Sequence, residues 1–168
     1  YKALSKIDPS ITYMKPVGQQ YLDVDGNKID KDAVLFQKAF NLHKDDLPYM
    51  SPIASPRGFT ETYINTPKKE DLFNKIKTSN DYLLEKSSSI LYEGTGHAGV
   101  GSVFDCSNAT IAELLKTPVI IVSIGGIGKA IDEIMLNVSV FKQLGVNIMG
   151  VIINKVFSEK YDKIEKVI

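Results

Sequence analysis

Apolar side chains recur along much of the chain at the spacing of a helix. Between Asp30 and Leu42 they stand three or four positions apart, which places them on one helix face. At Thr66-Pro67, a hydroxyl that can cap a helix precedes a proline suited to the first helical position. The predicted helices are the end of one at Tyr1–Ile7, then Asp30–Leu42, one from Thr66 to Leu84 with a break near Ser79-Asn80, Asn108–Lys116, Lys129–Leu144, and one that begins at Ser158.

Other segments are apolar without the helical period and have the length of strands. The segments Val119–Ile124 and Val146–Ile153 show no polar alternation, which indicates burial on both faces, as in a parallel sheet covered by helices. The segment Leu47–Arg57 contains three prolines and predicts a loop. The whole pattern predicts an α/β fold in a single domain over residues 1–168, without internal repeats. The predicted strands are Ile11–Val17, Ile90–Tyr92, Val119–Ile124 and Val146–Ile153.

The composition is that of an ordinary globular protein, with 43% hydrophobic and 24% charged residues. Twenty basic and twenty acidic residues give a formal net charge of zero, so neither a nucleic-acid partner nor a polybasic membrane contact is expected. No apolar run reaches the roughly 18 residues of a membrane span, and no signal peptide is recognisable. Cys106 is the single cysteine, which predicts no internal disulfide and a reducing, cytoplasmic setting.

Polar and glycine-rich residues follow each predicted strand. In an open parallel sheet, ligands bind at the carboxyl ends of the strands, so these residues predict one site at that edge. After the four strands come Lys15 to Gln19, Glu93–Ser102, Gly125–Lys129 and Asn154-Lys155, in that order.

Two glycine-rich motifs are incomplete. The spacing Gly94-x-Gly96-x-x-Gly99 matches a dinucleotide fingerprint, but no helix opens at its last glycine and no acidic residue ends the next strand. A nicotinamide- or flavin-dependent oxidoreductase is therefore disfavoured. Gly125–Lys129 departs from a phosphate loop because Ser123 replaces its first glycine and no hydroxyl residue follows its lysine. This segment favours a turn into a helix whose N–H groups can still face an anion.

Several single polar residues have more than one interpretation. Asn154 ends a strand and can bind an adenine edge, whereas guanine recognition lacks support because Phe157 replaces the aspartate of an N-K-x-D motif. Arg57 could clamp a carboxylate or phosphate, although most loop arginines do not. His97 is interpreted as a polar loop residue near the site and Cys106 as a small buried side chain, since neither has a partner at a useful spacing.

Two acidic residues have the placement of magnesium ligands. Glu93 closes a buried strand, and Asp32 lies in the first turn of a predicted helix. Magnesium is commonly held by one or two carboxylates, with phosphate oxygens and water completing its shell. The alternatives are a solvated strand-end acid for Glu93 and a helix-dipole contact for Asp32. Lys15, beside Pro16, could stabilise charge on a transferred phosphoryl group, or could face solvent on an edge.

Four short motifs follow one another along the chain: Tyr13–Gly18, Asp32–Leu35, Tyr92–Gly96 and Val151–Lys155. In this order they resemble the dethiobiotin synthetase-like P-loop family. That family includes dethiobiotin synthetase, the synthetase domain of cobyrinic acid a,c-diamide synthases, and domains fused ahead of phosphate acetyltransferases. The segments Glu93–Asp105 and Gly125–Asp132 are most similar to the last two branches. The resemblance implies a three-layer P-loop NTPase-like fold, with a mainly parallel sheet covered by helices on both faces.

The resemblance also implies an activity and roles for residues. Members of the family activate a carboxylate or carbamate by γ-phosphoryl transfer from ATP, and an amine then displaces the phosphate. A small carboxylate or amine substrate, ATP and Mg²⁺ are therefore expected, and a homodimer, because members are often dimers. The implied roles are catalysis for Lys15, magnesium binding for Asp32 and Glu93, contact with adenine for Asn154, cofactor binding for Gly94, Gly96 and Gly125, and contact with substrate for Gln19, Arg57, Thr95 and His97.

Two features depart from the family's pattern. Dethiobiotin synthetases tend to have the motif E-G-A-G-G, whereas this chain has Thr95 and His97 in the segment that begins at Glu93. The family's first strand and phosphate loop are expected just before Tyr1, so that the given chain would be truncated at its N-terminus. Two interpretations follow: an ATP- and magnesium-dependent ligase-type domain, or a non-catalytic nucleotide- or effector-sensing module associated with another enzyme such as a phosphate acetyltransferase.

Overall fold

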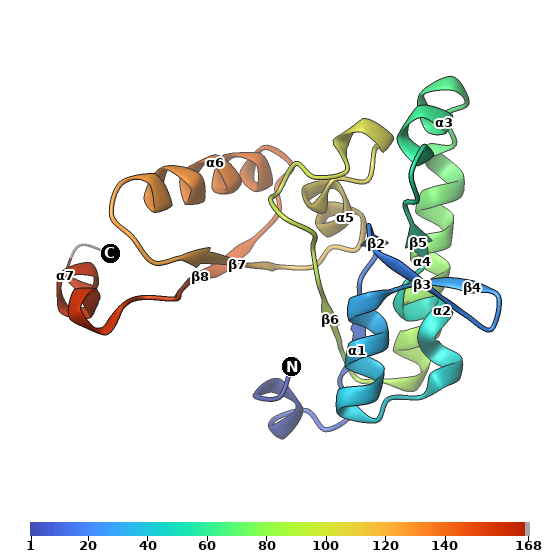
Figure 1. The fold of residues 1–168 in the computed structure, drawn as a ribbon, viewed down its shortest axis with the longest axis horizontal. Coiled ribbons are helices and arrows are strands. Elements are labelled where there is room, and N and C mark those ends of the chain that lie inside the picture. Colours follow the sequence, from blue (N-terminus) through green and yellow to red (C-terminus); the bar gives the residue numbers. More distant parts are fainter. Residues whose placement is uncertain (167–168) are drawn as a thin grey trace. The chain divides into compact units, whose positions relative to one another are not determined.

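A computed structural model describes residues 1–166, which group into two compact units (Figure 1). The first unit comprises residues 1–96 with 100–108, and the second comprises residues 97–99 with the chain from Ala109 onward. Both units contain parallel strands and helices, which confirms the predicted α/β class. None of the helices within residues 1–166 is long and apolar enough to cross a membrane.

The first unit contains three pairs of strands. In the first pair, β1 (Thr12–Met14) runs parallel to β6 (Ile90–Tyr92), with Met14 opposite Tyr92. The second parallel pair joins β2 (Val17–Gly18) to β5 (Ile53–Ala54), and the third is an antiparallel hairpin. The hairpin strands are β3 (Tyr21–Val24) and β4 (Asn27–Asp30). The helices of this unit are α1 (Lys31–Phe40), α2 (Leu47–Met50), α3 (Phe59–Asn65) and α4 (Lys69–Lys86). It also contains the 3-10 turns η1 (Leu4–Lys6), η2 (Lys44–Asp46) and η3 (Ser102–Phe104).

Helix α1 begins where its sequence predicts. The side chain of Asp30 accepts a hydrogen bond from the backbone N–H of Asp32, which caps the helix. At the other end, Asn41 adopts the left-handed conformation common after the last turn. The buried side chains of α1, Ala33 and Val34, contribute to a core that also includes the fully buried Tyr13, Met14, Met50, Ile76 and Leu83.

Several predicted elements differ from the structure. The opening helix is only the 3-10 turn η1, and the strand predicted over Ile11–Val17 is divided in two, because Pro16 has no N–H to donate to a neighbouring strand. The predicted loop Leu47–Arg57 contains α2 and β5. Helix α4 runs without a break through Ser79, which is buried against the core.

The hairpin β3–β4 and helix α3 were not among the predicted elements. The hairpin turn is Asp25-Gly26, and both residues have positive φ (52° and 79°), as a two-residue hairpin loop requires. An Asp-Gly pair between strand-length segments is a recognisable hairpin signal.

The second unit is built around two long parallel strands, β7 (Val119–Ile124) and β8 (Ile148–Asn154). Helix α6 (Lys129–Gln143) connects them, and α5 (Asn108–Leu114) precedes β7. A core of Ala98, Ala109, Ala112, Phe141 and Val146 covers one face of the strand pair. The 3-10 turn η4 (Ser158–Lys160) and the short helix α7 (Tyr161–Glu165) end the described chain.

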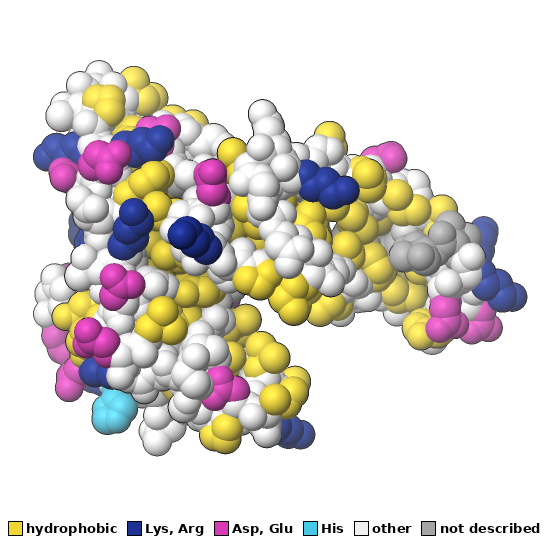
Figure 2. Space-filling model, turned by 180° about the vertical axis from the view of Figure 1, so that it is seen from behind, with side chains coloured by type: hydrophobic (Ala, Val, Ile, Leu, Met, Phe, Trp, Pro, Cys, Tyr) yellow, Lys and Arg dark blue, Asp and Glu magenta, His cyan; other side chains and the backbone are white. Residues whose placement is uncertain are grey.

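The other face of β7 differs from the double burial that its sequence predicts. Ile120, Val122 and Ile124 alternate with covered residues and are 51–63% exposed. The described helices of this unit pack on the opposite face, through residues such as Phe141. Figure 2 shows hydrophobic side chains gathered on the surface of this unit.

Candidate functional site

The candidate site lies at the carboxyl end of strands β1 and β6. Side chains alternate along a strand, so Tyr13 and Lys15 project to the same side of the chain around β1. Glu93 directly follows β6, and its backbone N–H donates to the carbonyl of Met14 (2.9 Å). The pairing of the two strands therefore brings Lys15 and Glu93, 78 positions apart in the sequence, to one place.

Helix α1 supplies the second acidic residue of the site. Asp32 and Phe36 are one helical turn apart and so lie on the same face of α1. The ring of Phe36 stacks on that of Tyr13, with centroids 3.8 Å apart, while Asp32 accepts a hydrogen bond from the Lys15 ammonium. Two residues one turn apart on α1 therefore meet two residues that are two positions apart on the strand segment: Phe36 contacts Tyr13, and Asp32 contacts Lys15.

The Lys15 ammonium is surrounded by three carboxylates. It contacts Asp32 directly, and its Nζ lies 3.2 Å from Asp30 Oδ1 and 3.6 Å from Glu93 Oε1. Burial alone would lower the pKa of Lys15, but the hydrogen bonds to Asp32 and Asp30 and the charges of Asp30 and Glu93 outweigh it, so that the pKa is raised. The side chain of Lys15 therefore stays charged although only 7% of it is exposed.

The charges in this cluster do not balance. One ammonium and three carboxylates leave a formal charge of −2. The side chain of Asp30 is buried (1% exposed), whereas those of Asp32 and Glu93 are 44% and 38% exposed. The excess negative charge is therefore carried where it can meet a ligand from solution.

Asp30 is a member of the site that the sequence analysis missed. Its Oδ1 accepts from the N–H of Asp32 (2.9 Å), its Oδ2 from the N–H of Gln20 (3.3 Å), and its own N–H donates to Ser51 Oγ (2.9 Å). A side chain at Gly18 would collide with the carboxylate of Asp30. An aspartate directly before a helix that starts Lys-Asp-Ala is a recognisable capping signal, but its contact with Lys15 depends on the folded chain.

Tyr13 is the other missed residue. Its side chain is fully buried, and its hydroxyl donates to Glu93 Oε2 (2.8 Å). Burial, followed by the charge of Glu93 and the hydrogen bond to it, raises the pKa of Tyr13 far above its ordinary value of 10. The alternation of Tyr13 with Lys15 along a strand was a signal that could have placed them together.

The glycine-rich segment after Glu93 lies against Asn108. Gly94 approaches the Asn108 side chain so closely that a Cβ at Gly94 would be 2.9 Å from its Oδ1. That Oδ1 accepts from the N–H of Thr95 (3.2 Å), while the Thr95 hydroxyl donates to the carbonyl of Val17 (3.1 Å). Gly96 has a positive φ of 68°. Thr95 therefore contributes to holding the loop in place.

The structure places Gln19 and Arg57 in exposed segments of the first unit. Gln19 follows β2, and Arg57 lies between β5 and α3. The contacts described for Lys15, Asp32 and Glu93 do not include either residue.

The remaining predicted residues belong to the second unit. Asn154 ends β8 opposite Ile124, and its carbonyl accepts from the N–H of Gly125 (2.6 Å), so Asn154 and Gly125 are neighbours. The side chain of Asn154 is turned to its own chain, accepting at Oδ1 from the N–H of Lys155 (2.9 Å). His97 is exposed, and its Nδ1 accepts from the N–H of Gly99 (3.2 Å).

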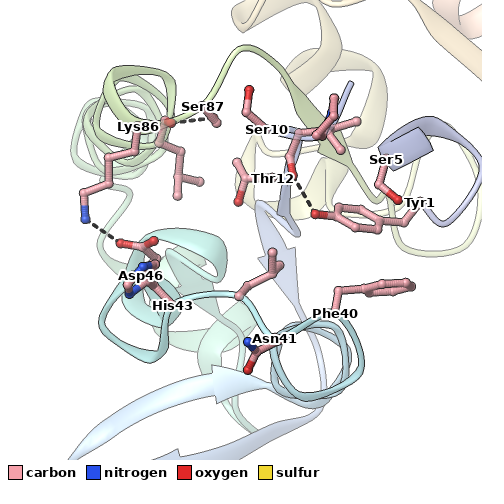
Figure 3. Close-up of a pocket in the computed structure, with 14 residues that line it drawn as sticks. Tyr1, Ser5, Ser10, Thr12, Phe40, Asn41, His43, Asp46, Lys86 and Ser87 are labelled. Carbon is pink, nitrogen blue, oxygen red and sulfur yellow. Dashed lines mark hydrogen bonds and ion pairs between the residues drawn. The ribbon is translucent and has the colours of Figure 1, made fainter. Parts of the chain in front are cut away.

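A cavity of about 670 Å³ lies at the opposite, amino end of β1 (Figure 3). Several of its polar side chains are engaged with one another or with the backbone. Asp46 accepts from Lys86 (2.7 Å) and Tyr82 (3.1 Å), and Tyr1 donates to the carbonyl of Ile11 (2.5 Å). This cavity therefore carries no excess charge comparable with that around Lys15.

Within residues 1–166, no group of three or more His, Cys, Asp or Glu side chains is arranged to hold a metal ion. The predicted magnesium pair, Asp32 and Glu93, is smaller than such a group. Both carboxylates contact the same Lys15 ammonium, so a single positive charge already lies between them.

Two comparisons with known proteins bear on the site. The model of a family described as AAA domain matches residues 1–168. The ATP-dependent dethiobiotin synthetase BioD of Methanocaldococcus jannaschii is 26% identical to this chain over 177 residues, an alignment that covers 98% of this chain and 78% of that protein.

Proposed function

The chain belongs to the family of AAA domains, and on that basis we propose that it is an ATP- and magnesium-dependent ligase that activates a small carboxylate or carbamate by phosphoryl transfer. Its α/β fold of parallel strands and helices is that of the P-loop NTPases. The similarity to an ATP-dependent dethiobiotin synthetase over 98% of the chain supports ligase chemistry of this type.

The observation that carries the proposal is the buried Lys15 ammonium among carboxylates at the ends of two parallel strands. In phosphoryl transfer, the protein contributes mainly by positioning the reactants and stabilising charge, and little by covalent chemistry. A lysine that stays protonated despite burial supplies a fixed positive charge for the transferred phosphoryl group. In this role, its ammonium exchanges a contact with Asp32 for one with a phosphate oxygen.

The carboxylates suit magnesium in their chemistry. Asp32 and Glu93 are oxygen donors, partly exposed, in a cluster with a formal charge of −2, and Mg²⁺ is usually bound by one or two carboxylates. We assign them as the residues that hold the ion, whereas the buried Asp30 holds Lys15. Bound Mg²⁺ would neutralise charge on the phosphate oxygens of ATP.

Adenine and substrate are assigned to the strand ends and loops. Asn154, at the end of β8 beside Gly125, offers an amide suited to an adenine edge. Gly94 and Gly96 allow backbone to approach a nucleotide closely. Arg57, Gln19, Thr95 and His97 are the proposed substrate contacts, with the exposed Arg57 guanidinium as partner for a substrate carboxylate. The substrate could be of the dethiobiotin or the cobyrinate type.

The test is magnesium-dependent phosphate release from ATP by the full-length protein, measured with a panel of small dicarboxylates and diamino acids. Glu93→Gln keeps the size of the side chain, removes its charge and is expected to lower turnover at least a hundredfold. Glu61→Gln, on the exposed first turn of α3, is the matched control and should match the unaltered protein. Nucleotide binding without turnover in the unaltered protein would instead assign the chain as a nucleotide-sensing module.

A further inference from the structure

We infer that Tyr13 is a positioning residue that sets Glu93 for the metal ion before the ion arrives. This inference rests on the proposed function, because it concerns the same carboxylate. Tyr13 itself touches neither nucleotide nor substrate in this scheme, and it acts through Glu93 alone.

The two oxygens of Glu93 have different surroundings. Oε2 accepts the hydrogen bond from the Tyr13 hydroxyl (2.8 Å), while Oε1 faces the Lys15 ammonium at 3.6 Å. A hydrogen bond at one oxygen fixes the rotation of the whole carboxylate. Oε1 is therefore held toward the side on which a cation lies, as outer-shell hydrogen bonds do for metal ligands in general.

The Tyr13 ring is held by burial and by one stacked aromatic ring. It is fully buried on β1, and Phe36 of α1 stacks on it at 3.8 Å with an angle of 13° between the rings. Phe36 stands one turn after Asp32 on the same helix, so the stack also fixes the distance between α1 and the strand. One ring thus joins the two elements that carry Asp32 and Glu93.

The hydroxyl of Tyr13 remains a donor. A phenol is uncharged at physiological pH, because its ordinary pKa is about 10. A neutral phenol orients the Glu93 carboxylate without adding a positive charge that would compete with a metal ion, which distinguishes Tyr13 from Lys15 as a partner of Glu93.

Asp32 has no such support from a phenol. Its described side-chain partner is the Lys15 ammonium, and 44% of its side chain is exposed. When Lys15 turns to a phosphate oxygen, Asp32 loses that contact, whereas Glu93 keeps Tyr13. Glu93 is therefore the preset ligand and Asp32 the adjustable one.

The experiment compares Tyr13→Phe with Tyr82→Phe in the full-length protein. Tyr82 is the matched control because its hydroxyl also donates to a carboxylate, Asp46, and its ring is also stacked, on Tyr49. Mn²⁺ binding is measured by loss of the free-ion signal in electron paramagnetic resonance. Tyr13→Phe is expected to weaken Mn²⁺ binding about tenfold, within the range for lost outer-shell partners, and Tyr82→Phe to leave it unchanged.

A kinetic measurement distinguishes a positioning role of Tyr13 from a general loss of active-site structure. In Tyr13→Phe, the Mg²⁺ concentration for half-maximal ATP turnover should rise about tenfold, while kcat at saturating Mg²⁺ stays within about twofold of the unaltered protein. A fall in kcat alone, or Mn²⁺ binding equal to that of the unaltered protein, overturns the inference. If the unaltered protein binds Mn²⁺ no better than Glu93→Gln, the proposed function fails instead.

If Tyr13→Phe does not fold, Phe36→Leu provides a second test. This change keeps the hydroxyl but removes the aromatic stack on the Tyr13 ring. Mn²⁺ binding is then expected to weaken about threefold, a smaller loss than for an outer-shell partner that is removed altogether. No change in Mn²⁺ binding by Phe36→Leu would overturn the inference.

Discussion

The two ends of strand β1 carry the same kinds of side chain in different proportions. At the carboxyl end, Lys15 and the stacked Tyr13 meet three carboxylates. At the amino end, Lys86 and the stacked Tyr82 meet one carboxylate, Asp46. The first cluster has a formal charge of −2 and a buried lysine, whereas the second is neutral and its lysine is 49% exposed.

The cavity of about 670 Å³ lies at the neutral end, whereas the site proposed for ATP and magnesium lies at the charged end. The charges of Asp46 and Lys86 cancel, so no excess charge remains there for a ligand to neutralise. Around Lys15, the carboxylates outnumber the cation, and two of them reach the surface. This imbalance of charge, which the fold itself sustains, is the reason for placing the proposed site at the carboxyl end.

Removing each lysine is expected to give the largest difference between the two ends of β1. Lys15→Met is expected to lower ATP turnover by a factor of about 10² to 10³, as for loss of one group that stabilises transition-state charge. It also leaves Asp30 buried without its cation, which should cost about 3 kcal/mol in the free energy of unfolding. Turnover assays and urea unfolding of Lys15→Met and Lys86→Met measure both effects, and equal losses in the two variants would contradict the comparison.

A smaller effect is expected from crowding the carboxyl end. Gly18→Ala forces its new methyl group against the Asp30 carboxylate, which should lower the free energy of unfolding by about 1–3 kcal/mol and reduce turnover. Gly150→Ala in β8 is the control, since no atom lies within 4 Å of its added Cβ. Urea unfolding of the two variants should separate them clearly, and matching unfolding curves would show that Asp30 is not held as described.

Raising the pH tests whether the charge of Lys15 stabilises the fold. The pKa of Lys15 is raised in the folded protein above its ordinary 10.5, so its ion pairs stabilise the fold fully below pH 10.5 and lose this effect as the pH rises through the folded value. The difference in free energy of unfolding between the unaltered protein and Lys15→Met should stay constant from about pH 7 to 10 and shrink above it. A difference that falls already between pH 7 and 9 would place the ammonium outside the carboxylate cluster.

The smallest effect is expected at the amino end. Asp46→Asn keeps an oxygen for the Tyr82 hydroxyl and removes the charge opposite the half-exposed Lys86. Such a pair contributes at most about 1 kcal/mol, so thermal unfolding should shift only slightly and ATP turnover should not change. A loss of turnover in Asp46→Asn would give the amino-end cavity a part in the chemistry.

Local pattern was sufficient for some of the elements that position the site, whereas the hairpin that carries Asp30 was missed. The strands Ile90–Tyr92 and Val119–Ile124 have the predicted bounds, and the helix predicted from Asp30 is α1. The structure also brings Lys15, Asp32 and Glu93 together, while their roles remain predictions.

The parts that the sequence did not predict depend on contacts between distant segments. Nothing near Asp30 in the chain indicates that its carboxylate will meet Lys15, and nothing near Tyr13 indicates Glu93. In the proline-rich segment, α2 forms because Leu47 and Met50 are buried, which the local composition does not reveal. The bare face of β7 likewise depends on which helices cover it.

The hydrogen bond between Tyr13 and Glu93 joins residues 80 positions apart. Contacts of such separation carry a loop-closure cost, and they slow the folding of a domain. A nascent or partly folded chain therefore has Lys15, Asp32 and Glu93 but no site. Assembly of the charged cluster is therefore part of the folding of the first unit, and the ligand binding proposed for this cluster depends on that folding.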